Sequence, residues 1–589
     1  MQETSSILLS RSDIQKLLGL KGLIGKLAAS IAYRVLELDT VNATFAPQRE
    51  KQGPEFSAGI LEEIGIGVDF NPAQLKYIPA EGGFFTVSNH HYGAADGLIL
   101  SSIIGSHRKD LRILTTFFLS LIPNLRQTFI PVDNFSSGGA RSVSGIRTAL
   151  EHISSGGALS LFPAGEVATW QHREHIVEDK PWADNMMKLI LRSGLPVVPV
   201  YFDGENSASF HRLGRIYPML RTIRLPHELF NKRGKTIKVR MGRAIEPQEF
   251  AGLDAKSLGT YLRNRCYALG AQCEAAVPAA ARKEALAQPQ PAALVAEQVE
   301  ALGEDKLLFE SGDYRLYLVS ASDAPAAMRE IYRLREETFR AIGEGTGSAE
   351  DTDKYDLSYS HLILWNVPGR EIAGAFRIGD RQPFYTADLV KYGAGSAEIL
   401  GKSLELGRSF IALKYQKDVQ SLKLLLSGIN ASVLHYPDSE YFVGTVTISN
   451  SVPQLLKSLI VKFVSEHFAM PGAEAIAAPS HPFSSDFGKV DADGLLMQCG
   501  GDLDNFDKLL ANLSDGSCRI PVLMKRYLKC GAKVVCFNVD PDFSDCLDGL
   551  FVHRFADFPK EAIAPFVRVL PEDMRLALYK RFYGDSYED

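Results

Sequence analysis

Residues 84–97 read FFTVSNHHYGAADG, and this stretch decides the architecture of the N-terminal half of the chain. Phe84–Val87 is a short apolar run typical of a buried strand, and the turn that follows carries His90, His91 and Asp96. Short apolar runs that alternate with helical patterns predict an α/β domain, in which such a turn lies at the end of a strand. The further strand-like runs of this half are Ile113–Leu121, Leu159–Phe162, Pro196–Phe202 and Ile237–Met241.

The His and Asp residues of this turn are the components of a general base. A carboxylate fixes the tautomer of an imidazole, and the free ring nitrogen then takes a proton from an attacking hydroxyl group. Asp96 lies six residues after His90 and five after His91. Because His and Asp residues at such spacings also arise by chance, the pair needs supporting motifs.

Two later blocks supply that support: residues 161–166, LFPAGE, and residues 196–204, PVVPVYFDG. In this order the three blocks resemble the glycerolipid acyltransferase family of the lysophosphatidic acid acyltransferase type, and in particular its hemolysin-like branch, over about residues 55–245. The resemblance implies an H-x4-D base and an acceptor-binding block. Ala164 stands where the wider family has a glutamate, and Glu166 is the possible substitute. The acceptor-binding residues implied are Phe162, Pro163, Gly165 and Glu166.

The doubled histidine leaves the base open. The H-x4-D spacing selects His91, whereas alignment through Asn89 and Gly93 to the N-H-P-x-G form of the hemolysin-like branch selects His90, which we favour slightly. Arg141 and Arg147 occupy positions where the family holds acceptor head groups; the alternative interpretation is a solvated helix face.

Residues 275–296 contain ten Ala and three Pro in 22 positions with no aromatic residue, a composition that cannot build a packed core. The sequence therefore predicts a domain at 1–270, a linker at 271–300 and a second domain at 301–589, with few contacts across the linker. In the second domain a helix is expected at Ala326–Ile342 and another near residues 417–434. Strands are expected at His361–Trp365, Ile372–Ile378, Ser403–Ala412, Tyr441–Ile448 and Lys533–Asn538.

The second domain carries charged residues on mostly apolar elements, which indicates buried charges held in pairs. In the order of these charged residues, the stretch of about residues 313–450 resembles the GNAT-like acyltransferases that include acyl-homoserine lactone synthases and ornithine N-acyltransferases. The resemblance implies that Glu405 is the base or positions a water; the alternative interpretation is that it pairs with an arginine such as Arg408. The matching positions are Arg335, Phe339, Asp353, Asp356, Arg377, Glu405 and Arg408.

The fusion of these two parts resembles the bifunctional ornithine lipid synthases. That resemblance implies that the second domain N-acylates ornithine with a 3-hydroxyacyl group and that the first O-acylates the resulting hydroxyl. The acyl donor is expected to be acyl carrier protein, or acyl-CoA, with no bound cofactor, no metal and no nucleophilic serine or cysteine. Three alternatives stay open: glycine or another amine, one active domain beside a degenerate one, and a non-enzymatic membrane-binding hemolysin.

The charge distribution bears on partners and location. The net charge is −6 overall, with +6 in residues 1–270 and −12 in the remainder, so the first domain is expected to meet an anionic surface. A basic amphipathic helix at residues 14–36 either lies on an anionic membrane or packs on its own domain. No signal peptide, no spanning segment and no CxxC pair among the seven cysteines is found. We therefore expect a cytoplasmic protein, peripheral on the inner face of the cytoplasmic membrane, that meets a lipid substrate and acyl carrier protein but no nucleic acid.

Overall fold

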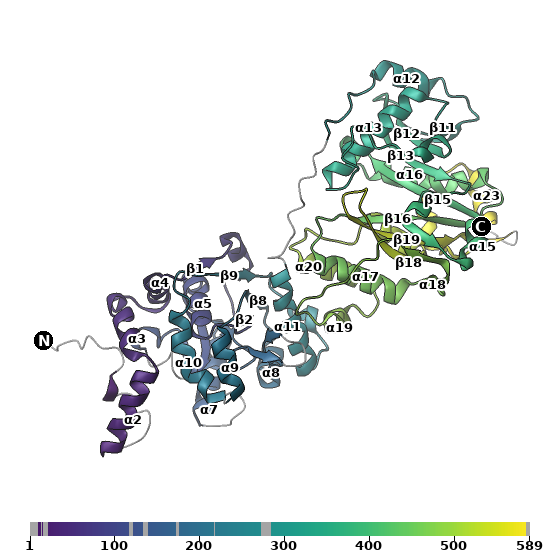
Figure 1. Cartoon of the computed structure of the whole chain (residues 1–589). Helices are drawn as coiled ribbons and strands as arrows, with labels where there is room; N and C mark the ends of the chain where they lie inside the picture. Colours follow the sequence, from purple (N-terminus) through teal and green to yellow (C-terminus); the bar gives the residue numbers. More distant parts are fainter. Residues whose placement is uncertain are drawn as a thin grey trace. The chain divides into compact units, whose positions relative to one another are not determined.

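The computed structural model describes residues 10–12, 15, 22–116, 122–132, 140–171, 176–216, 218–271 and 284–584. The chain divides into two compact units, each with its own sheet (Figure 1). Unit 1 consists of Met1–Glu274 and Phe487–Ser517, and unit 2 consists of Ala275–Asp486 and Cys518–Asp589. The prediction of two α/β domains is confirmed.

Unit 1 is built on a seven-stranded sheet in the order β1-β9-β8-β2-β5-β3-β4. All neighbouring strands are parallel except the antiparallel pair β8 and β9. Every residue of β2 is buried, as expected for a parallel strand with helices on both faces. The strands are β1 (Gly67–Asp69), β2 (Phe84–Ser88), β3 (Arg112–Thr116), β4 (Phe129–Val132), β5 (Ala158–Leu161), β8 (Val197–Phe202) and β9 (Thr236–Met241).

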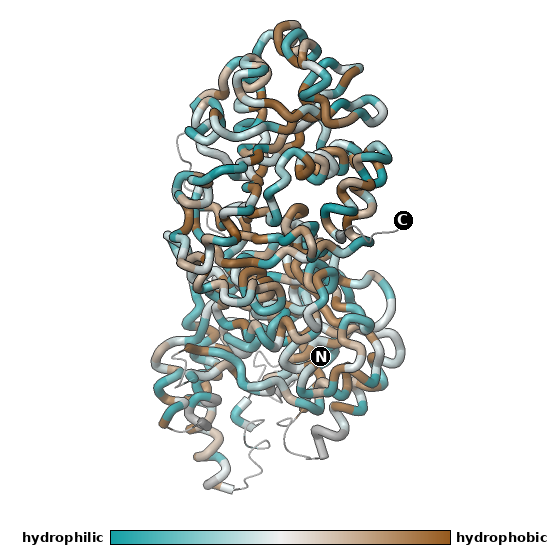
Figure 2. Tube along the Cα trace, turned by 90° about the vertical axis from the view of Figure 1, so that its right-hand side faces the viewer, coloured by the Kyte–Doolittle hydropathy of each residue, from teal (hydrophilic) through white to brown (hydrophobic). Residues whose placement is uncertain are grey.

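The core of unit 1 is formed by apolar side chains that these strands and the flanking helices bury together. The hydropathy colouring in Figure 2 shows the brown, hydrophobic segments mixed with teal, hydrophilic ones along the elements, because one face of each surface helix meets solvent. The helices are α2 (Gly22–Val35), α3 (Leu38–Phe45), α4 (Gly53–Ile64), α5 (Ala94–His107), α7 (Ala140–Ser154), α8 (Asp184–Ser193), α9 (Ala208–Ile216), α10 (Pro218–Phe230) and α11 (Ala255–Ala271), and a small hairpin is formed by β6 (Thr169–Gln171) and β7 (Ile176–Glu178).

Residues 487–517 belong to unit 1, although they lie far along the chain, and this corrects the continuous second domain expected at 301–589. This segment carries α19 (Ala492–Leu496) and α20 (Leu503–Leu513), which pack against α11. Polar contacts fix it as well: the Asn264 side chain accepts the backbone N–H of Asp491 at 3.0 Å, and the Lys489 ammonium donates to the Val177 carbonyl at 2.9 Å. The segment buries apolar residues of α20, and α11 supplies the surface that covers them.

Unit 2 is built on an eight-stranded sheet in the order β10-β11-β12-β13-β15-β16-β19-β18. Its pairs are antiparallel except β15 with β16, which are parallel over Ser403–Leu406 and Tyr441–Gly444 only. Beyond Leu406 and Gly444 these two strands continue without pairing to each other. The strands are β10 (Leu307–Ser311), β11 (Tyr314–Ser320), β12 (Ser360–Asn366), β13 (Glu371–Gly379), β15 (Ser403–Ile411), β16 (Tyr441–Ile448), β18 (Lys533–Asp540) and β19 (Cys546–Arg554).

The linker predicted at 271–300 is shorter in the structure. Residues 284–291 already form hydrogen bonds with the rest of unit 2, for example from the Ala287 N–H to the Ala349 carbonyl at 3.0 Å. Helix α12 (Ala292–Glu300) then buries Val295 and Val299 in the unit 2 core, because these two apolar residues lie on one helix face. The other main helices of unit 2 are α13 (Pro325–Ala341), α16 (Val419–Ser432), α17 (Gln454–Phe468), α21 (Val522–Lys529), α22 (Lys560–Val567) and α23 (Glu572–Tyr583).

The strands and helices expected at 361–448 and 533–538 are all present. Of the strand expected at Ile113–Leu121, β3 accounts for residues 113–116, and residues 117–121 lie outside the described part. Of the helix expected at 14–36, α2 accounts for residues 22–35, and residues 14 and 16–21 lie outside the described part. Within the described part of the chain, no helix has the length and apolar character needed to cross a bilayer.

Candidate functional site

The first site in unit 1 is built on Asp96 at the start of α5. Its Oδ2 atom accepts three hydrogen bonds, from His90 Nδ1 at 2.9 Å and from the backbone N–H groups of Tyr92 at 2.9 Å and Gly93 at 3.0 Å. The positive φ of Gly93, 78°, turns the chain into the helix, so the carboxylate caps the helix and holds the imidazole at once. A proton on Nδ1 leaves Nε2 of His90 as the acceptor.

His90 is placed for proton transfer. Its side chain is 18% exposed, and within the described part of the chain Nε2 makes no hydrogen bond. One ring face stacks on Phe162, with ring centroids 4.3 Å apart. The His90 backbone N–H donates to Asp179 Oδ1 at 3.1 Å, and burial raises the pKa of the Asp179 carboxyl to about 6. The imidazole is therefore fixed on three sides while one nitrogen stays open.

His91 has a different environment. It is 1% exposed, and burial together with the charge of Lys489 lowers the pKa of its imidazole to about 3. Its Nε2 lies 3.4 Å from the Tyr267 hydroxyl rather than against Asp96. Of the two histidines left open by the sequence, the geometry favours His90 as the base, and its catalytic role stays a prediction.

The acceptor block predicted at Phe162–Glu166 follows β5 as a tight turn. Gly165 has φ of 71°, and its N–H donates to the Phe162 carbonyl at 3.0 Å, while the Pro163 carbonyl accepts the Ala183 N–H at 2.9 Å. The Glu166 side chain is about one-third exposed and forms ion pairs with Lys180 at 2.5 Å and with Arg221 of α10. The block thus presents charge beside the Phe162 ring on which His90 stacks.

Burial alone would raise the pKa of the Glu166 carboxyl, but the hydrogen bond from Lys180 and the charge of Arg221 outweigh it and lower that pKa. Arg221 and Lys180 were missed by the sequence analysis, because no motif marks them and only the fold brings them to Glu166. The Arg141 side chain lies outside the described residues. Arg147 is exposed and pairs with Glu151 one turn on, which fits the alternative of a solvated helix face.

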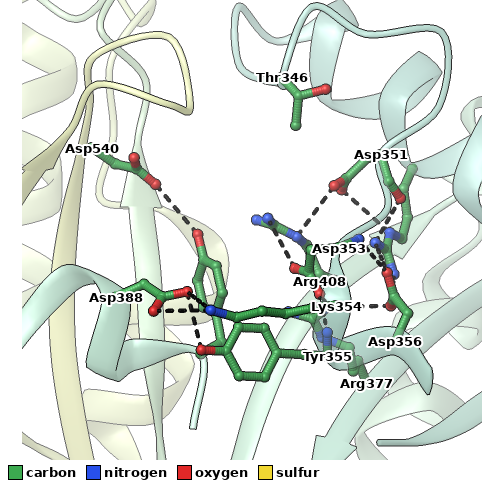
Figure 3. Close-up of polar contacts among 12 residues, drawn as sticks. Thr346, Asp351, Asp353, Lys354, Tyr355, Asp356, Arg377, Asp388, Arg408 and Asp540 are labelled. Carbon is green, nitrogen blue, oxygen red and sulfur yellow. Dashed lines mark hydrogen bonds and ion pairs between the residues drawn. The ribbon is translucent and has the colours of Figure 1, made fainter. Parts of the chain in front are cut away.

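The site of unit 2 contains a buried network of arginines and aspartates (Figure 3). Arg335 of α13 donates to Asp356 from both terminal nitrogens, at 2.8 and 3.1 Å, and its Nε donates to Asp351 at 3.2 Å. Arg377 of β13 donates to Asp353 at 2.7 Å and to Asp356 at 3.1 Å. Burial would raise the pKa of the Asp356 carboxyl, but the charges of Arg335 and Arg377 lower it well below its usual range.

Arg408 joins this network from β15. Its guanidinium lies 3.4 Å from Asp351 and 3.6 Å from Asp353, and between the rings of Tyr385 at 4.8 Å and Phe543 at 5.0 Å. The backbone of Arg408 has φ of 51°, at the position where the pairing of β15 with β13 shifts register. A left-handed non-glycine residue is strained, and such strain persists where the surrounding packing holds it.

Arg408, Tyr385 and Phe543 separate two cavities. The strand-gap cavity, of about 400 Å³, lies where β15 and β16 diverge and is lined by Leu406–Ser409, Thr445–Ser449 and Phe339, among others. The acidic cavity, of about 360 Å³, is lined by Asp353, Asp388 and Asp540. The structure thus brings the predicted Arg335, Asp353, Asp356, Arg377 and Arg408 into one network, and places Phe339 in the wall of the strand-gap cavity.

Glu405 lies apart from this network, also in the wall of the strand-gap cavity. Among the described residues it pairs with no arginine; instead its two oxygens accept the backbone N–H groups of Tyr385 and Thr386, both at 2.8 Å, and the hydroxyls of Thr386 and Tyr359. Burial raises the pKa of the Glu405 carboxyl, and these donors partly offset that effect. With every donor supplied by the protein, the geometry favours a positioning role for Glu405, and its predicted role as a base stays untested.

Comparison with known families separates the chain in the same way. A family model described as "Acyltransferase" matches residues 32–276, and one described as "Acetyltransferase (GNAT) domain" matches residues 334–426. The prediction that the chain is an acyltransferase with a glycerolipid-type domain followed by a GNAT domain is confirmed.

The chain is similar to two kinds of curated protein. It is 35% identical over 189 residues to a glycine N(alpha)-acyltransferase of Phocaeicola vulgatus, covering 28% of this chain and 58% of the relative. It is 25% identical over 250 residues to a lyso-glycine lipid O-acyltransferase of Bacteroides thetaiotaomicron, covering 40% of this chain and 89% of the relative. The chain therefore spans about 60% of the length of the glycine N(alpha)-acyltransferases that it matches.

Two solved structures are also similar. A 1-acyl-sn-glycerophosphate acyltransferase from Thermotoga maritima matches 37% of this chain and 82% of its own, at 15% identity and a TM-score of 0.24. A CoA-dependent acyl-homoserine lactone synthase matches 24% of this chain and 70% of its own, at 14% identity and a TM-score of 0.17.

Proposed function

We propose that this chain carries out both acylations of an aminolipid. Unit 2 joins a 3-hydroxyacyl group to the α-amino group of an amino acid, and unit 1 then acylates the new hydroxyl group. The observation that supports this most directly is the His90–Asp96 pair with an open Nε2, in a chain that also resembles an N-acyltransferase of glycine. Each unit would consume or supply what the other needs.

In unit 1, Nε2 of His90 takes the proton of the acceptor hydroxyl as its oxygen attacks the thioester carbonyl carbon. The C–O bond forms, the C–S bond breaks, and the thiolate leaves and receives a proton. Asp96 stabilises the imidazolium that forms in between. Glu166, which pairs with Lys180 and Arg221, lies in the same turn as Phe162, and the Phe162 ring stacks on His90. We propose that these paired charges bind the polar head of the lyso-lipid.

In unit 2, the acyl donor is proposed to enter the strand-gap cavity, since the unpaired edges of β15 and β16 offer backbone donors and acceptors to the amide groups of a pantetheine arm. Acyl carrier protein and CoA both carry this arm, so we propose either as donor. We propose a direct transfer that uses no metal and no bound cofactor.

Glycine is the amine that we propose first. The curated relatives that the chain resembles are named for glycine and for lyso-glycine lipid, which supports glycine over the ornithine implied by the sequence resemblance. Ornithine remains the second candidate.

Helix α2 supports a membrane surface as the place of work. Leu23, Leu27, Ile31 and Val35 form one exposed stripe along it, from 85% to 49% exposed, while Ala29 and Tyr33 of the opposite face are buried. Lys26 and Arg34 flank the stripe. An apolar stripe beside basic residues fits the interface of an anionic bilayer, so we propose a peripheral protein on the inner face of the cytoplasmic membrane.

The test is expression of the whole chain in a host that lacks aminolipids, followed by mass spectrometry of the lipid extract. A diacylated glycine lipid is the expected product, and an ornithine lipid would move the proposal to the second amine. Lyso-lipid without diacyl lipid would leave unit 2 as the sole active unit, and no N-acyl product with either amine would refute the proposal.

A further inference from the structure

The strand-gap cavity contains one carboxylate that the predicted site does not use. Glu344 lines this cavity and is 8% exposed. Within the described part of the chain its carboxylate makes no hydrogen bond and no ion pair, and the only charge that acts on it notably is Asp548 of β19. By contrast, Glu405 in the same cavity has donors from three residues.

The loop that carries Glu344 is held firmly. Gly343 and Gly345 flank it with φ of 79° and 100°, which non-glycine residues rarely adopt. The Glu336 carboxylate of α13 accepts the N–H of Thr346 at 3.1 Å and of Gly347 at 2.8 Å, and so fixes the loop to the helix. The position of the Glu344 side chain is therefore set by the hydrogen bonds of its loop to Glu336, and not by hydrogen bonds of its own carboxylate.

An unpaired carboxylate that is nine-tenths buried costs free energy, and the cost is greater beside a second buried carboxylate. Asp548 is 3% exposed and accepts the Thr447 hydroxyl at 2.7 Å. Burial first and Asp548 second raise the pKa of the Glu344 carboxyl to about 7. Burial likewise raises the pKa of Asp548 to about 7, with Asp540 of β18 adding to it and Arg408 of β15 opposing it.

Arg377 and Arg408 also line the cavity, but their charges face the aspartates of the network, whereas the unpaired carboxylate of Glu344 offers a place for a small cation. The proposed substrate of unit 2 carries one, since an α-amino group is an ammonium ion at neutral pH and cannot attack until it loses a proton. Glu344 lies in the cavity that the diverging strands line, where the thioester is proposed to lie.

We propose that Glu344 binds the substrate ammonium and takes its proton. The inference rests on the proposed function of unit 2 and names the residue that activates its amine. The N–H bond breaks as Glu344 becomes a carboxylic acid, and the nitrogen lone pair forms the C–N bond at the thioester carbonyl. The attacking nitrogen then loses its second proton, which passes through solvent to the thiolate as the C–S bond breaks, and Glu344 returns its own proton to solvent. Glu405 acts by holding Tyr385 and Thr386 in the cavity wall.

The first test compares Glu344→Gln with the wild type in the full chain, using glycine, ornithine and a 3-hydroxyacyl thioester. A general base contributes about 10²–10⁴-fold, so kcat is expected to fall by that factor while the melting temperature holds or rises, because an unpaired buried charge is removed. Hydroxylamine is uncharged at neutral pH and needs no base, so its acylation is expected to fall far less.

Glu337→Gln is the matched control, since Glu337 lies on α13 at the surface, one-third exposed, and pairs only loosely with Arg333 at 3.4 Å. It should keep wild-type turnover. A folded Glu344→Gln protein with turnover of glycine within threefold of the wild type would overturn the inference, as would an equal loss with hydroxylamine. A wild-type chain that acylates no amine would instead refute the proposed function.

Asp548→Asn gives a second measurement should Glu344→Gln fail to fold. Asp548 raises the pKa of Glu344, and the base works only when ionised, above that pKa. Removing the charge of Asp548 lowers the pKa, so the acid limb of kcat/KM against pH is expected to move to lower pH. Cys546, which also lies near these carboxylates, has its pKa raised to about 12 by burial and does not titrate in that range. An acid limb that stays in place would overturn the inference.

Discussion

Replacing Glu405 by glutamine tests whether this carboxylate positions the site or performs the chemistry. The carboxylate accepts four hydrogen bonds, two from backbone N–H groups and two from hydroxyls. A glutamine has only one acceptor oxygen. With that oxygen toward Thr386, its NH₂ group replaces the oxygen that accepts from the Tyr385 N–H and the Tyr359 hydroxyl.

The magnitude follows from the hydrogen bonds that are lost. The Tyr385 N–H keeps a second acceptor, the Tyr359 hydroxyl oxygen at 3.0 Å, so the substitution removes the two hydrogen bonds to the carboxylate oxygen without leaving that N–H unpaired. At about 0.5–1.5 kcal/mol each, two lost hydrogen bonds cost about 1–3 kcal/mol. For a unit of this size each kcal/mol lowers the melting temperature by about 2–4 °C, so a decrease of roughly 2–12 °C is expected.

The assay measures calorimetric unfolding and N-acylation on the same preparation, with Glu398→Gln as the matched control, since Glu398 is an exposed carboxylate at the start of a short helix, α15 (Ala397–Leu400). If Glu405 positions Tyr385 and Thr386, the melting temperature falls and turnover of the folded protein drops only partly. An unchanged melting temperature with turnover at background would refute this reasoning and restore Glu405 as the base.

Three further predictions concern the rest of the molecule. His90→Ala should lower O-acylation by about 10²–10⁴-fold so that lyso-lipid accumulates in mass spectra, whereas a folded His91→Ala should keep the diacyl product; equal losses in both variants would contradict the choice of His90. Charging the exposed stripe of α2 by Leu27→Glu with Ile31→Glu should weaken sedimentation with anionic vesicles tenfold or more, and unchanged binding would exclude this face. The fragment of residues 284–589, which keeps α12, should aggregate when expressed alone, because it carries α20 without the surface of unit 1 that covers it, and monodisperse protein in gel filtration would show that this surface is dispensable.

Local pattern was enough to predict most of the sheet strands. The runs at Phe84–Val87 and Tyr441–Ile448 are apolar, short and bounded by polar or turn-forming residues, so neighbouring residues in the sequence are enough to predict that they are buried. The place of residues 487–517 was not predictable in this way. The apolar spacing of α20 indicates that one face is buried, but nothing local identifies a helix more than 200 residues away as its partner.

The same distinction applies to the sites. The motifs predicted that His90 and Asp96 lie in one turn, yet only the geometry favours His90 over His91 as the base, because the two histidines differ in burial and not in sequence context. Glu344 was overlooked because a glutamate between two glycines is typical of a solvated loop. Its burial depends on the loop that Glu336 of α13 holds in place and on β19, and these two parts of the chain come together only in the folded unit.

The carboxylates of both units divide by how many donors they have. The carboxylates of Asp356 and Glu405 are buried and accept hydrogen bonds from several donors, so their charge stabilises the folded unit. Replacing either residue is therefore expected first of all to lower stability. Asp96 also has donors, but one of them is the imidazole of His90, whose other nitrogen is open. The charge of Asp96 therefore also influences proton transfer at that nitrogen. Glu344 is buried and receives no donor from the described residues, and a fold that keeps such a group gains nothing from it in the absence of a cation. Unpaired burial, rather than burial alone, is thus the feature that distinguishes the residue available for chemistry from those that hold the cavity in shape.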